Sequence, residues 1–302
     1  MIELNYYLLD VFTSEPFGGN PLAVFPNADG IGTATMGRIA NELNLSETTF
    51  IQSPTTAESD CTVRIFTPKQ EIPMAGHPTI GTAAAILGNG LLKPKQASRL
   101  LFDEGVGQIR VDIGNPDTGA MTLMMHQPTP EFFEILDKQT IASLLSLRPE
   151  DIDSDLPVQI VSCGIPFIIV PLKSLESVRR ATPRHDLMSL NLERQRSQEI
   201  LVFTEETLKG DSDIHSRMFA PRFGVPEDPA TGSAQGPLGC YLFNYERFQG
   251  GKLRSEQGYE MGRPSEISIE IHGTHPSVTQ VIVGGTSVDM GSGTIRIKDV
   301  SS

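Results

Sequence analysis

A short motif that occurs twice constrains the fold of this chain more than any other feature. HPTIGTA begins at His77 and DPATGSA begins at Asp228, and three of the seven positions are identical. The residues before each motif also match, because RIFTPK at Arg64 corresponds to RMFAPR at Arg217. The copies are 228 − 77 = 151 residues apart, about half of the 302-residue chain. The repeat therefore predicts two homologous domains, each with a strand that leads through a proline-rich turn into a buried helix.

The pattern of apolar residues indicates a protein built mainly from short strands. Several segments alternate apolar and polar residues with period two, whereas residues 34–43 repeat their apolar residues with helical spacing. Strands are expected at 4–12, 22–25, 48–52, 62–66, 121–126, 200–203, 267–271 and 278–283, and helices at 34–43, 78–87, 140–147 and 229–243. Because helices and strands do not alternate strictly, the pattern favours an α+β fold over a doubly wound sheet.

The length of the chain also suits two domains of about 150 residues each. We predict a first domain at 1–126, joined by a C-terminal strand at 287–302, and a second domain at 127–286. The expected linker is the segment rich in proline and acidic residues at 127–134. Pseudo-twofold packing of two such domains would leave a cleft between them, which is the expected place for a ligand.

Charge and cysteine content narrow the classes of function. The net charge of −13 argues against nucleic acid or an anionic membrane as a partner, because both require a basic surface. The three cysteines are far apart and form no CxxC pair, so neither a disulfide framework nor a zinc ribbon is indicated. The N-terminus has no basic segment, and no apolar run approaches 18 residues. A cytoplasmic protein with a small-molecule ligand is the expectation.

Each copy of the motif has the composition of a helix start that can bind an anion. Asp228-Pro229 and His77-Pro78 are expected to place an N-cap residue before a proline at the first helical position, where the missing N–H costs nothing. A cap with a purely structural role has the same pattern. Small residues would leave backbone N–H groups approachable, and they are Gly76, Gly81, Gly232 and Ser233. Since a helix N-terminus favours an anion, two such starts facing each other across the cleft would hold a carboxylate.

A proton carrier is expected close to the first helix start. In NELNLSETTF, Ser46 and Glu47 stand between a predicted helix end and an apolar strand. A glutamate at such a position is commonly a solvated surface residue. If the strand edge places Glu47 over the cleft, partial burial would suit the carboxyl group to proton transfer.

Four motifs together resemble the phenazine-biosynthesis PhzF-like family, which is similar in fold to diaminopimelate epimerase. They are NPLAVF at Asn20, SETTF at Ser46, GHPTIGTA at Gly76 and EDPATGSA at Glu227, in the order and spacing typical of the family. The resemblance runs nearly from end to end. It implies two similar domains, each a curved mixed or antiparallel sheet around a central helix, in a homodimer, and catalysis without a metal or organic cofactor.

The resemblance also implies roles for individual residues. In the family's isomerase, the glutamate of the SE motif moves a proton between carbons of a dihydro-hydroxyanthranilate, and its neighbours on the two helix starts hold the ring carboxylate and amine. Transferred to this chain, Glu47 is the catalytic acid and base. The implied substrate-binding residues are Ser46, Gly76, His77, Asp228, Gly232 and Ser233.

One departure from related epimerases bears on the reaction. Epimerases of this fold use paired cysteines, one at each helix start, but this chain has Ala75 and Gly76 at one start and Ser233 and Ala234 at the other. The cysteines Cys61, Cys163 and Cys240 are expected to be small buried hydrophobic residues.

The expected function is therefore a cofactor-independent isomerase that moves a proton on a small carboxylate-bearing amino or cyclic compound. The alternatives are an amino-acid epimerase or racemase, and a non-catalytic small-molecule binding protein. Two further motifs are not assigned a function. His272-Gly-Thr-His275 is expected to be a turn that lacks a third metal ligand, and the glycine-rich segment that begins at Gly284 is expected to be a hairpin. The remaining histidines, His126, His185 and His215, are expected to be surface residues or satisfied strand residues.

Overall fold

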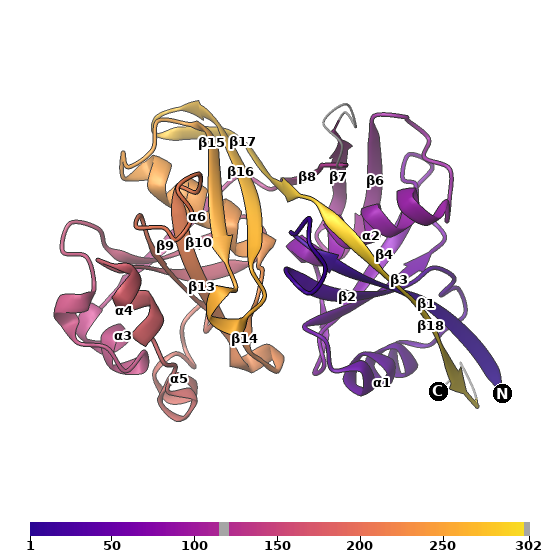
Figure 1. The fold of residues 1–302 in the computed structure, drawn as a ribbon, viewed down its shortest axis with the longest axis horizontal. Coiled ribbons are helices and arrows are strands. Elements are labelled where there is room, and N and C mark those ends of the chain that lie inside the picture. Colours follow the sequence, from indigo (N-terminus) through magenta and orange to yellow (C-terminus); the bar gives the residue numbers. More distant parts are fainter. Residues whose placement is uncertain (115–120, 299–302) are drawn as a thin grey trace. The chain divides into compact units, whose positions relative to one another are not determined.

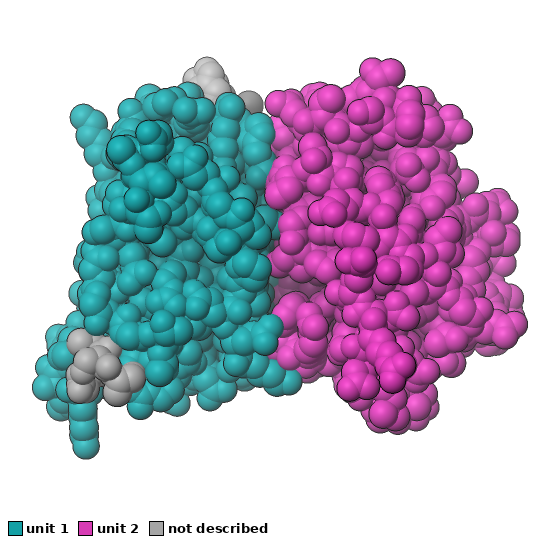
Figure 2. Space-filling view, turned by 180° about the vertical axis from the view of Figure 1, so that it is seen from behind, with its two compact units in different colours: residues 1–126, 284–302 teal, residues 127–283 magenta. Residues whose placement is uncertain are grey.

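The structure is a computed structural model that describes residues 1–114 and 121–298. The chain divides into two compact units, coloured separately in Figure 2. The first unit is Met1–His126 with Gly284–Ser302, and the second unit is Gln127–Val283. Residues 284–286, which were expected in the second domain, belong to the first unit.

The described residues of the first unit form a mixed sheet with the helices α1 and α2 (Figure 1). Its elements are β1 (Ile2–Val11), β2 (Asn20–Phe25), α1 (Thr33–Leu43), β3 (Glu47–Gln52), β4 (Cys61–Phe66), β5 (Glu71–Ile72), α2 (Gly76–Asn89), β6 (Arg99–Glu104), β7 (Gly107–Ile113), β8 (Leu123–Gln127) and β18 (Ser287–Ile297). The pairs β2–β3 and β4–β6 are parallel, whereas β18–β1, β1–β2, β3–β4, β6–β7 and β7–β8 are antiparallel. The sheet thus joins the C-terminal strand β18 to the N-terminal strand β1.

The second unit contains a sheet of the same kind with four helices (Figure 1). Its elements are β9 (Glu131–Leu136), α3 (Lys138–Leu144), β10 (Val158–Ser162), β11 (Pro166–Pro171), α4 (Leu175–Arg180), α5 (His185–Asn191), β12 (Ile200–Thr204), β13 (Ile214–Ala220), β14 (Val225–Asp228), α6 (Gly232–Asn244), β15 (Gly251–Gln257), β16 (Ser265–Thr274) and β17 (Ser277–Gly285). Short 3₁₀ helices lie at Pro149–Asp151, Pro221–Phe223 and Tyr259–Met261. The pairs β11–β12 and β13–β15 are parallel, and β9–β10, β10–β11, β12–β13 and β15–β16 are antiparallel.

The two units therefore repeat one order of strand pairings. In the parallel pairs, Cys61 lies opposite Phe102 and Ile214 lies opposite Ser255, so both partners are offset by 153 residues (214 − 61 and 255 − 102). The matched arginines also make the same contact, since Nε of Arg64 is 2.8 Å from Glu71 and Nε of Arg217 is 2.8 Å from Glu227. The sequence repeat is thus accompanied by a repeat of topology.

Alternating residues of each sheet build two cores, one on each face. In β2, Ala23 and Phe25 pack with the apolar face of α1, whereas Leu22 faces α2. In the second unit, alternate strand residues also point to opposite faces of the sheet. Those on one face pack in a hydrophobic cluster with α3, α4 and α5, and those on the other face pack with α6. Residues 76–86 of α2 and residues 232–243 of α6 are all buried, which is the pattern of a helix enclosed by protein.

The glycine at the centre of the first motif allows α2 to approach the sheet. A Cβ atom placed on Gly81 would lie 2.5 Å from Leu22 Cδ2 and 2.7 Å from Val11 Cγ2. Both distances are far below the 3.5–4.0 Å of ordinary carbon contacts. Gly81 is therefore explained by packing, and the interpretation that it leaves backbone N–H groups open to a ligand is not needed.

The predicted helix starts are wrong by several residues. Helix α2 begins at Gly76 with Ala75 as its N-cap, so His77 lies inside the first turn. Helix α6 begins only at Gly232 with Thr231 as its N-cap, and Asp228 is the last residue of β14. The connection before Asp228 is two residues shorter than the one before His77. The chain therefore stays extended up to Asp228, which pairs with Met218 on β13.

Two local predictions are also corrected. The expected linker at 127–134 begins at the boundary between the two units, but it contains the end of β8 and most of β9. His272 lies on β16, which continues to Thr274, so the expected turn comes later. The glycine-rich segment after Gly284 is not a hairpin, because β18 pairs with β1 across a bulge at Leu8 and Leu9. No helix in the described ranges has the length and apolarity needed to cross a membrane.

Candidate active site

Glu47 and His77 lie side by side in the first unit, together with Asn20. Glu47 is the first residue of β3 and lies opposite Leu22 on β2, while Asn20 begins β2 and His77 lies in the first turn of α2. Nε2 of His77 is 3.2 Å from Oε2 of Glu47, and its Nδ1 is 3.0 Å from Nδ2 of Asn20. The Glu47 side chain is 13% exposed and that of His77 is 3% exposed. The imidazole thus bridges a buried amide and a partly accessible carboxylate.

The contact with Asn20 defines the tautomer of His77. An amide nitrogen only donates hydrogen bonds, so Nδ1 of the imidazole accepts from Nδ2 of Asn20. A neutral imidazole has one N–H, which is then at Nε2, the nitrogen that faces Glu47. Asn20 was not among the predicted site residues, although it opens the NPLAVF motif. The sequence signal that indicates it is a polar residue directly before the apolar run of a predicted strand.

Burial keeps His77 neutral. Desolvation lowers the pKa of the His77 imidazole to about 3. The 3.2 Å separation from Glu47 meets the distance of an ion pair, but an imidazole with so low a pKa carries no charge at neutral pH. The carboxyl group of Glu47 therefore lies beside a neutral imidazole N–H group.

In the second unit, Asp228 is held in a short turn before α6. Oγ1 of Thr231 donates to Oδ2 of Asp228 at 2.5 Å, and the Asp228 residue is 5% exposed. The fully buried amide of Gln257 fixes the same turn. Its Nε2 donates to the carbonyl of Asp228 at 2.7 Å, and its Oε1 accepts from the N–H of Thr231 at 3.1 Å. Gln257 gave no signal in the sequence, because it lies 29 residues after Asp228 at the end of β15.

The other predicted residues lie at the ends of these elements. Gly76 is the first residue of α2, and Ser46 precedes β3 and is partly exposed. Gly232 and Ser233 are the first two residues of α6, where unpaired backbone N–H groups and the helix dipole favour an anion. Glu47 and His77 are therefore in contact within the first unit, and Asp228, Gly232 and Ser233 occupy one turn of the second unit. That both groups serve one ligand stays a prediction.

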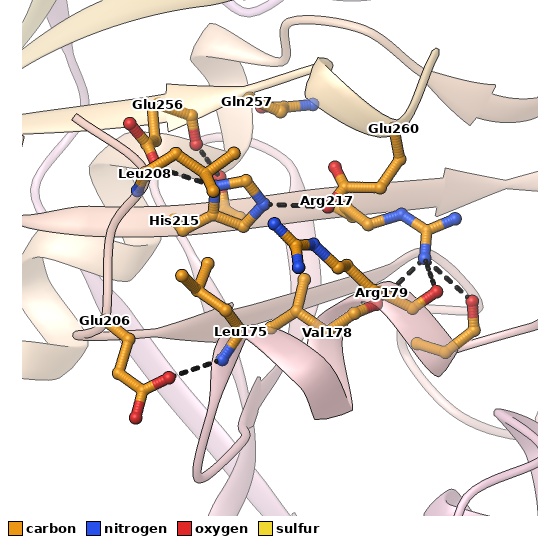
Figure 3. Close-up of polar contacts among 12 residues, drawn as sticks. Leu175, Val178, Arg179, Glu206, Leu208, His215, Arg217, Glu256, Gln257 and Glu260 are labelled. Atoms are coloured by element: carbon orange, nitrogen blue, oxygen red, sulfur yellow. Dashed lines mark hydrogen bonds and ion pairs between the residues drawn. The ribbon is translucent and has the colours of Figure 1, made fainter.

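His215 forms a second buried histidine–carboxylate cluster (Figure 3). Its Nδ1 is 2.8 Å from Glu256 and its Nε2 is 3.0 Å from Glu260. Burial alone would lower the pKa of His215, but the hydrogen bonds to Glu260 and Glu256 outweigh burial and raise it. Glu256 also accepts from the backbone N–H groups of Leu208 and Lys209, so the cluster ties the loop before β13 to β15. This arrangement is that of a structural ion pair, and His215 is a satisfied strand residue as expected.

The remaining histidines and the cysteines do not extend the site. His272 is 3.5 Å from Glu270, and within residues 1–114 and 121–298 no group of three or more His, Cys, Asp or Glu side chains is arranged to hold a metal ion. Cys61, Cys163 and Cys240 are buried and free, as predicted. The Sγ atoms of Cys163 and Cys240 are 3.8 Å apart in the core beside α6.

Comparison with known proteins identifies the family. The model of the phenazine biosynthesis-like protein family matches residues 9–293, so the chain belongs to this family. A trans-2,3-dihydro-3-hydroxyanthranilate isomerase from Pseudomonas fluorescens is 35% identical over 292 residues, which cover 96% of this chain and 99% of that protein. The crystal structure of a Bacillus anthracis phenazine biosynthesis protein of the PhzF family has a TM-score of 0.89 at 29% identity, and covers 98% of this chain and 100% of that one.

A more distant structure shows how widely the fold is shared. A hydroxyproline epimerase from Agrobacterium vitis has a TM-score of 0.66 at 11% identity, over 98% of this chain and 93% of that chain, which shows the fold alone. The fold is thus a mixed α/β fold with a large mixed sheet. The family expected from the four motifs is confirmed, and so is the expected class of enzyme, an isomerase.

Proposed function

We propose that this isomerase moves a proton between carbons of a small carboxylate-bearing amino or cyclic compound, with Glu47 as the acid and base. The observation that supports this proposal is the contact of the Glu47 carboxylate with a buried, neutral His77 whose tautomer is fixed by Asn20. The relative from Pseudomonas fluorescens, an isomerase of trans-2,3-dihydro-3-hydroxyanthranilate, indicates the class of substrate.

The proposed step transfers one proton and uses no other reactant. The Glu47 carboxylate takes a proton from one carbon of the substrate, and the electron pair of that C–H bond moves into the adjacent double-bond system. Glu47, now a carboxylic acid, returns the proton to another carbon and becomes a carboxylate again. A neutral His77 suits this cycle, because a cation at 3.2 Å would stabilise the carboxylate and make it a weaker base.

Asp228, Gly232 and Ser233 are proposed to bind the polar groups of the substrate. The carboxylate of Asp228 suits an amine, and the N-terminus of α6 suits a carboxylate. Ser46 and Gly76 are proposed to add a hydroxyl and a backbone donor near Glu47. The expected homodimer also stays a prediction, which sedimentation analysis would check.

An amino-acid epimerase receives less support from the structure. Paired thiols at the two helix starts are replaced by Ala75, Gly76, Ser233 and Ala234. The three cysteines lie elsewhere and are buried, and burial raises the pKa of the Cys61 and Cys163 thiols. Such thiols are poor bases and nucleophiles.

Solvent deuterium incorporation tests the proposal. A panel of carboxylates that includes trans-2,3-dihydro-3-hydroxyanthranilate is incubated in heavy water with the wild type, Glu47→Gln and Glu42→Gln. Glu47→Gln should lose at least about a hundredfold in exchange rate, the scale of general acid–base catalysis, with ligand binding largely kept. Glu42 is exposed on α1, so Glu42→Gln makes the same change of charge and should exchange like the wild type. Near-normal exchange by Glu47→Gln would remove Glu47 from the reaction.

A further inference from the structure

Glu104 is a buried carboxyl group close to the start of α2. It is the last residue of β6, it is 8% exposed, and Oε1 is 2.6 Å from Oγ1 of Thr79. The same Thr79 oxygen is 2.6 Å from the carbonyl oxygen of Ala75, the N-cap of α2. Thr79 is in the first turn of this helix, two residues after His77. Glu104 thus contacts the turn that carries His77.

The single hydroxyl hydrogen of Thr79 determines the protonation state of Glu104. A hydroxyl group has one hydrogen, which cannot lie along both 2.6 Å contacts. The carbonyl of Ala75 has no hydrogen to give, so the hydrogen at that contact comes from Thr79. The hydrogen at the other contact then comes from Glu104, which donates to Thr79 as a carboxylic acid. Both contacts are satisfied only while Glu104 is protonated.

The surroundings of Glu104 favour this neutral form. Glu104 lines a cavity of about 520 Å³ with Arg64, Glu71 and Asp103. The guanidinium of Arg64 is engaged by both carboxylate oxygens of Glu71, and Asp103 accepts hydrogen bonds from Thr55, Thr56 and Ser59. On β4, the thiol of Cys61 has a raised pKa because of burial, so it is neutral as well. Burial raises the pKa of Glu104 itself to about 8, although the hydrogen bond with Thr79 opposes this rise.

The internal repeat provides an independent reason to expect an uncharged hydrogen-bond donor at Glu104. The offset of 153 residues between the parallel strand pairs makes Gln257 (104 + 153) the counterpart of Glu104. Nε2 of Gln257 donates to Oγ1 of Thr231 at 3.0 Å, beside the start of α6. The second unit therefore has an uncharged donor to a threonine hydroxyl where the first unit has Glu104. An amide keeps this role at every pH, whereas a carboxyl group keeps it only until it ionises.

We propose that Glu104 is a positioning residue that holds the start of α2 as a neutral carboxylic acid, and that its ionisation lowers the isomerase activity in alkaline solution. Ionised Glu104 cannot donate to Thr79, and the new charge is buried without a cation that is free to pair with it among the described lining residues. The first turn of α2 then shifts and moves His77 relative to Glu47. The effect on activity rests on the proposed role of Glu47 and His77.

Two variants, compared with the wild type, test this proposal by activity. Glu104→Gln keeps an uncharged donor, and Glu58→Gln makes the same substitution at an exposed loop residue. The exchange rate of the wild type and of Glu58→Gln should fall about tenfold per pH unit above the pKa of Glu104. Glu104→Gln should keep its rate through the same range. An unchanged alkaline fall in Glu104→Gln would overturn the positioning role.

Two spectroscopic measurements on the ligand-free protein test the role of Glu104 without an activity assay. Their outcome therefore does not depend on whether Glu47→Gln confirms the proposed function. The infrared carbonyl band of a protonated carboxylic acid should be present at neutral pH in the wild type, disappear with a midpoint near 8 and be absent in Glu104→Gln. The ¹⁵N shifts of the His77 ring should change with the same midpoint in the wild type and stay constant in Glu104→Gln. If Glu104→Gln does not fold, Thr79→Val should move the infrared band to higher frequency, because the acid then lacks its acceptor. Absence of the band at neutral pH in the wild type would overturn the proposal.

Discussion

Gly81→Ala tests the close approach of α2 to the sheet. The added Cβ would lie 2.5 Å from Leu22 Cδ2 and 2.7 Å from Val11 Cγ2. Both partners are fully buried, and they lie on neighbouring strands of one sheet, so neither has space to move away. Overpacking of this kind costs about 1–3 kcal/mol, and the stiff side chain of Val11 favours the upper end. Alanine gains about 1 kcal/mol over glycine in a helix, so we expect a net loss of about 2 kcal/mol.

The same helix contains a matched control. Gly88 is exposed near the end of α2, and a Cβ placed there meets nothing within 4 Å. Gly88→Ala should therefore stabilise the protein by up to about 1 kcal/mol, from helix propensity alone. Urea unfolding of the wild type and the two variants gives the comparison, with an unchanged slope as the sign that only stability has changed. If Gly81→Ala is as stable as the wild type, or if both variants change by the same amount, the packing explanation is wrong.

The displacement of α2 that we expect in Gly81→Ala also has a consequence for activity. His77 precedes Gly81 by four residues, so both lie on the face of α2 that approaches β2. A methyl group that pushes this face from the sheet also lengthens the 3.0 Å contact between His77 and Asn20 at the start of β2. Gly81→Ala should therefore lower the exchange rate at temperatures where it is fully folded, whereas Gly88→Ala should not.

Two further predictions concern the second unit. The raised pKa of His215 means that its ion pairs stabilise the folded state at about pH 5.5, below the unfolded-state pKa of about 6.5, and lose this effect as the pH rises through the folded-state pKa. His215→Gln should therefore cost about 3–5 kcal/mol in urea unfolding at about pH 5.5, where glutamates are still ionised, and less in alkaline solution. A cost that does not depend on pH would contradict the charged state of His215. Gln257→Leu leaves the carbonyl of Asp228 and the N–H of Thr231 without this partner, so we expect a loss of about 1–3 kcal/mol for each buried group and weaker substrate binding. Unchanged KM in the folded variant would show that Gln257 does not position a binding residue.

The sequence predicted the elements better than their ends. All eight expected strands and all four expected helices are present, because apolar periodicity is a local property. The start of α6 was misplaced, since the pairing of Asp228 with Met218 keeps the chain extended and such a pairing has no local signal. The pairing of β18 with β1 joins residues nearly 300 positions apart, whereas the local sequence of the glycine-rich segment favours a hairpin.

The candidate site shows the same limit. Glu47 and His77 were identified because they lie in motifs, and the structure brings them into contact. Asn20, Glu104 and Gln257 were missed as site residues, although Asn20 belongs to a motif. Each acts through a partner that is distant in the sequence, and its residue type is ordinary on its own. Alignment of the two halves at an offset of 153 would have paired Glu104 with Gln257, but the two residues differ and their neighbours differ as well.

The low pKa of His77 bears on where the proton goes during the proposed reaction. Burial lowers the pKa of the His77 imidazole to about 3, well below the ordinary value of about 6.5. The imidazole 3.2 Å from Glu47 is therefore a poor acceptor for a proton that Glu47 takes up. It stays on the carboxyl group, from which it can return to the substrate. A histidine with an ordinary pKa of about 6.5 would compete for the proton and become a cation beside the base. Burial of His77, with Asn20 bound to its other nitrogen, thus favours return of the proton to the substrate over its transfer to the protein.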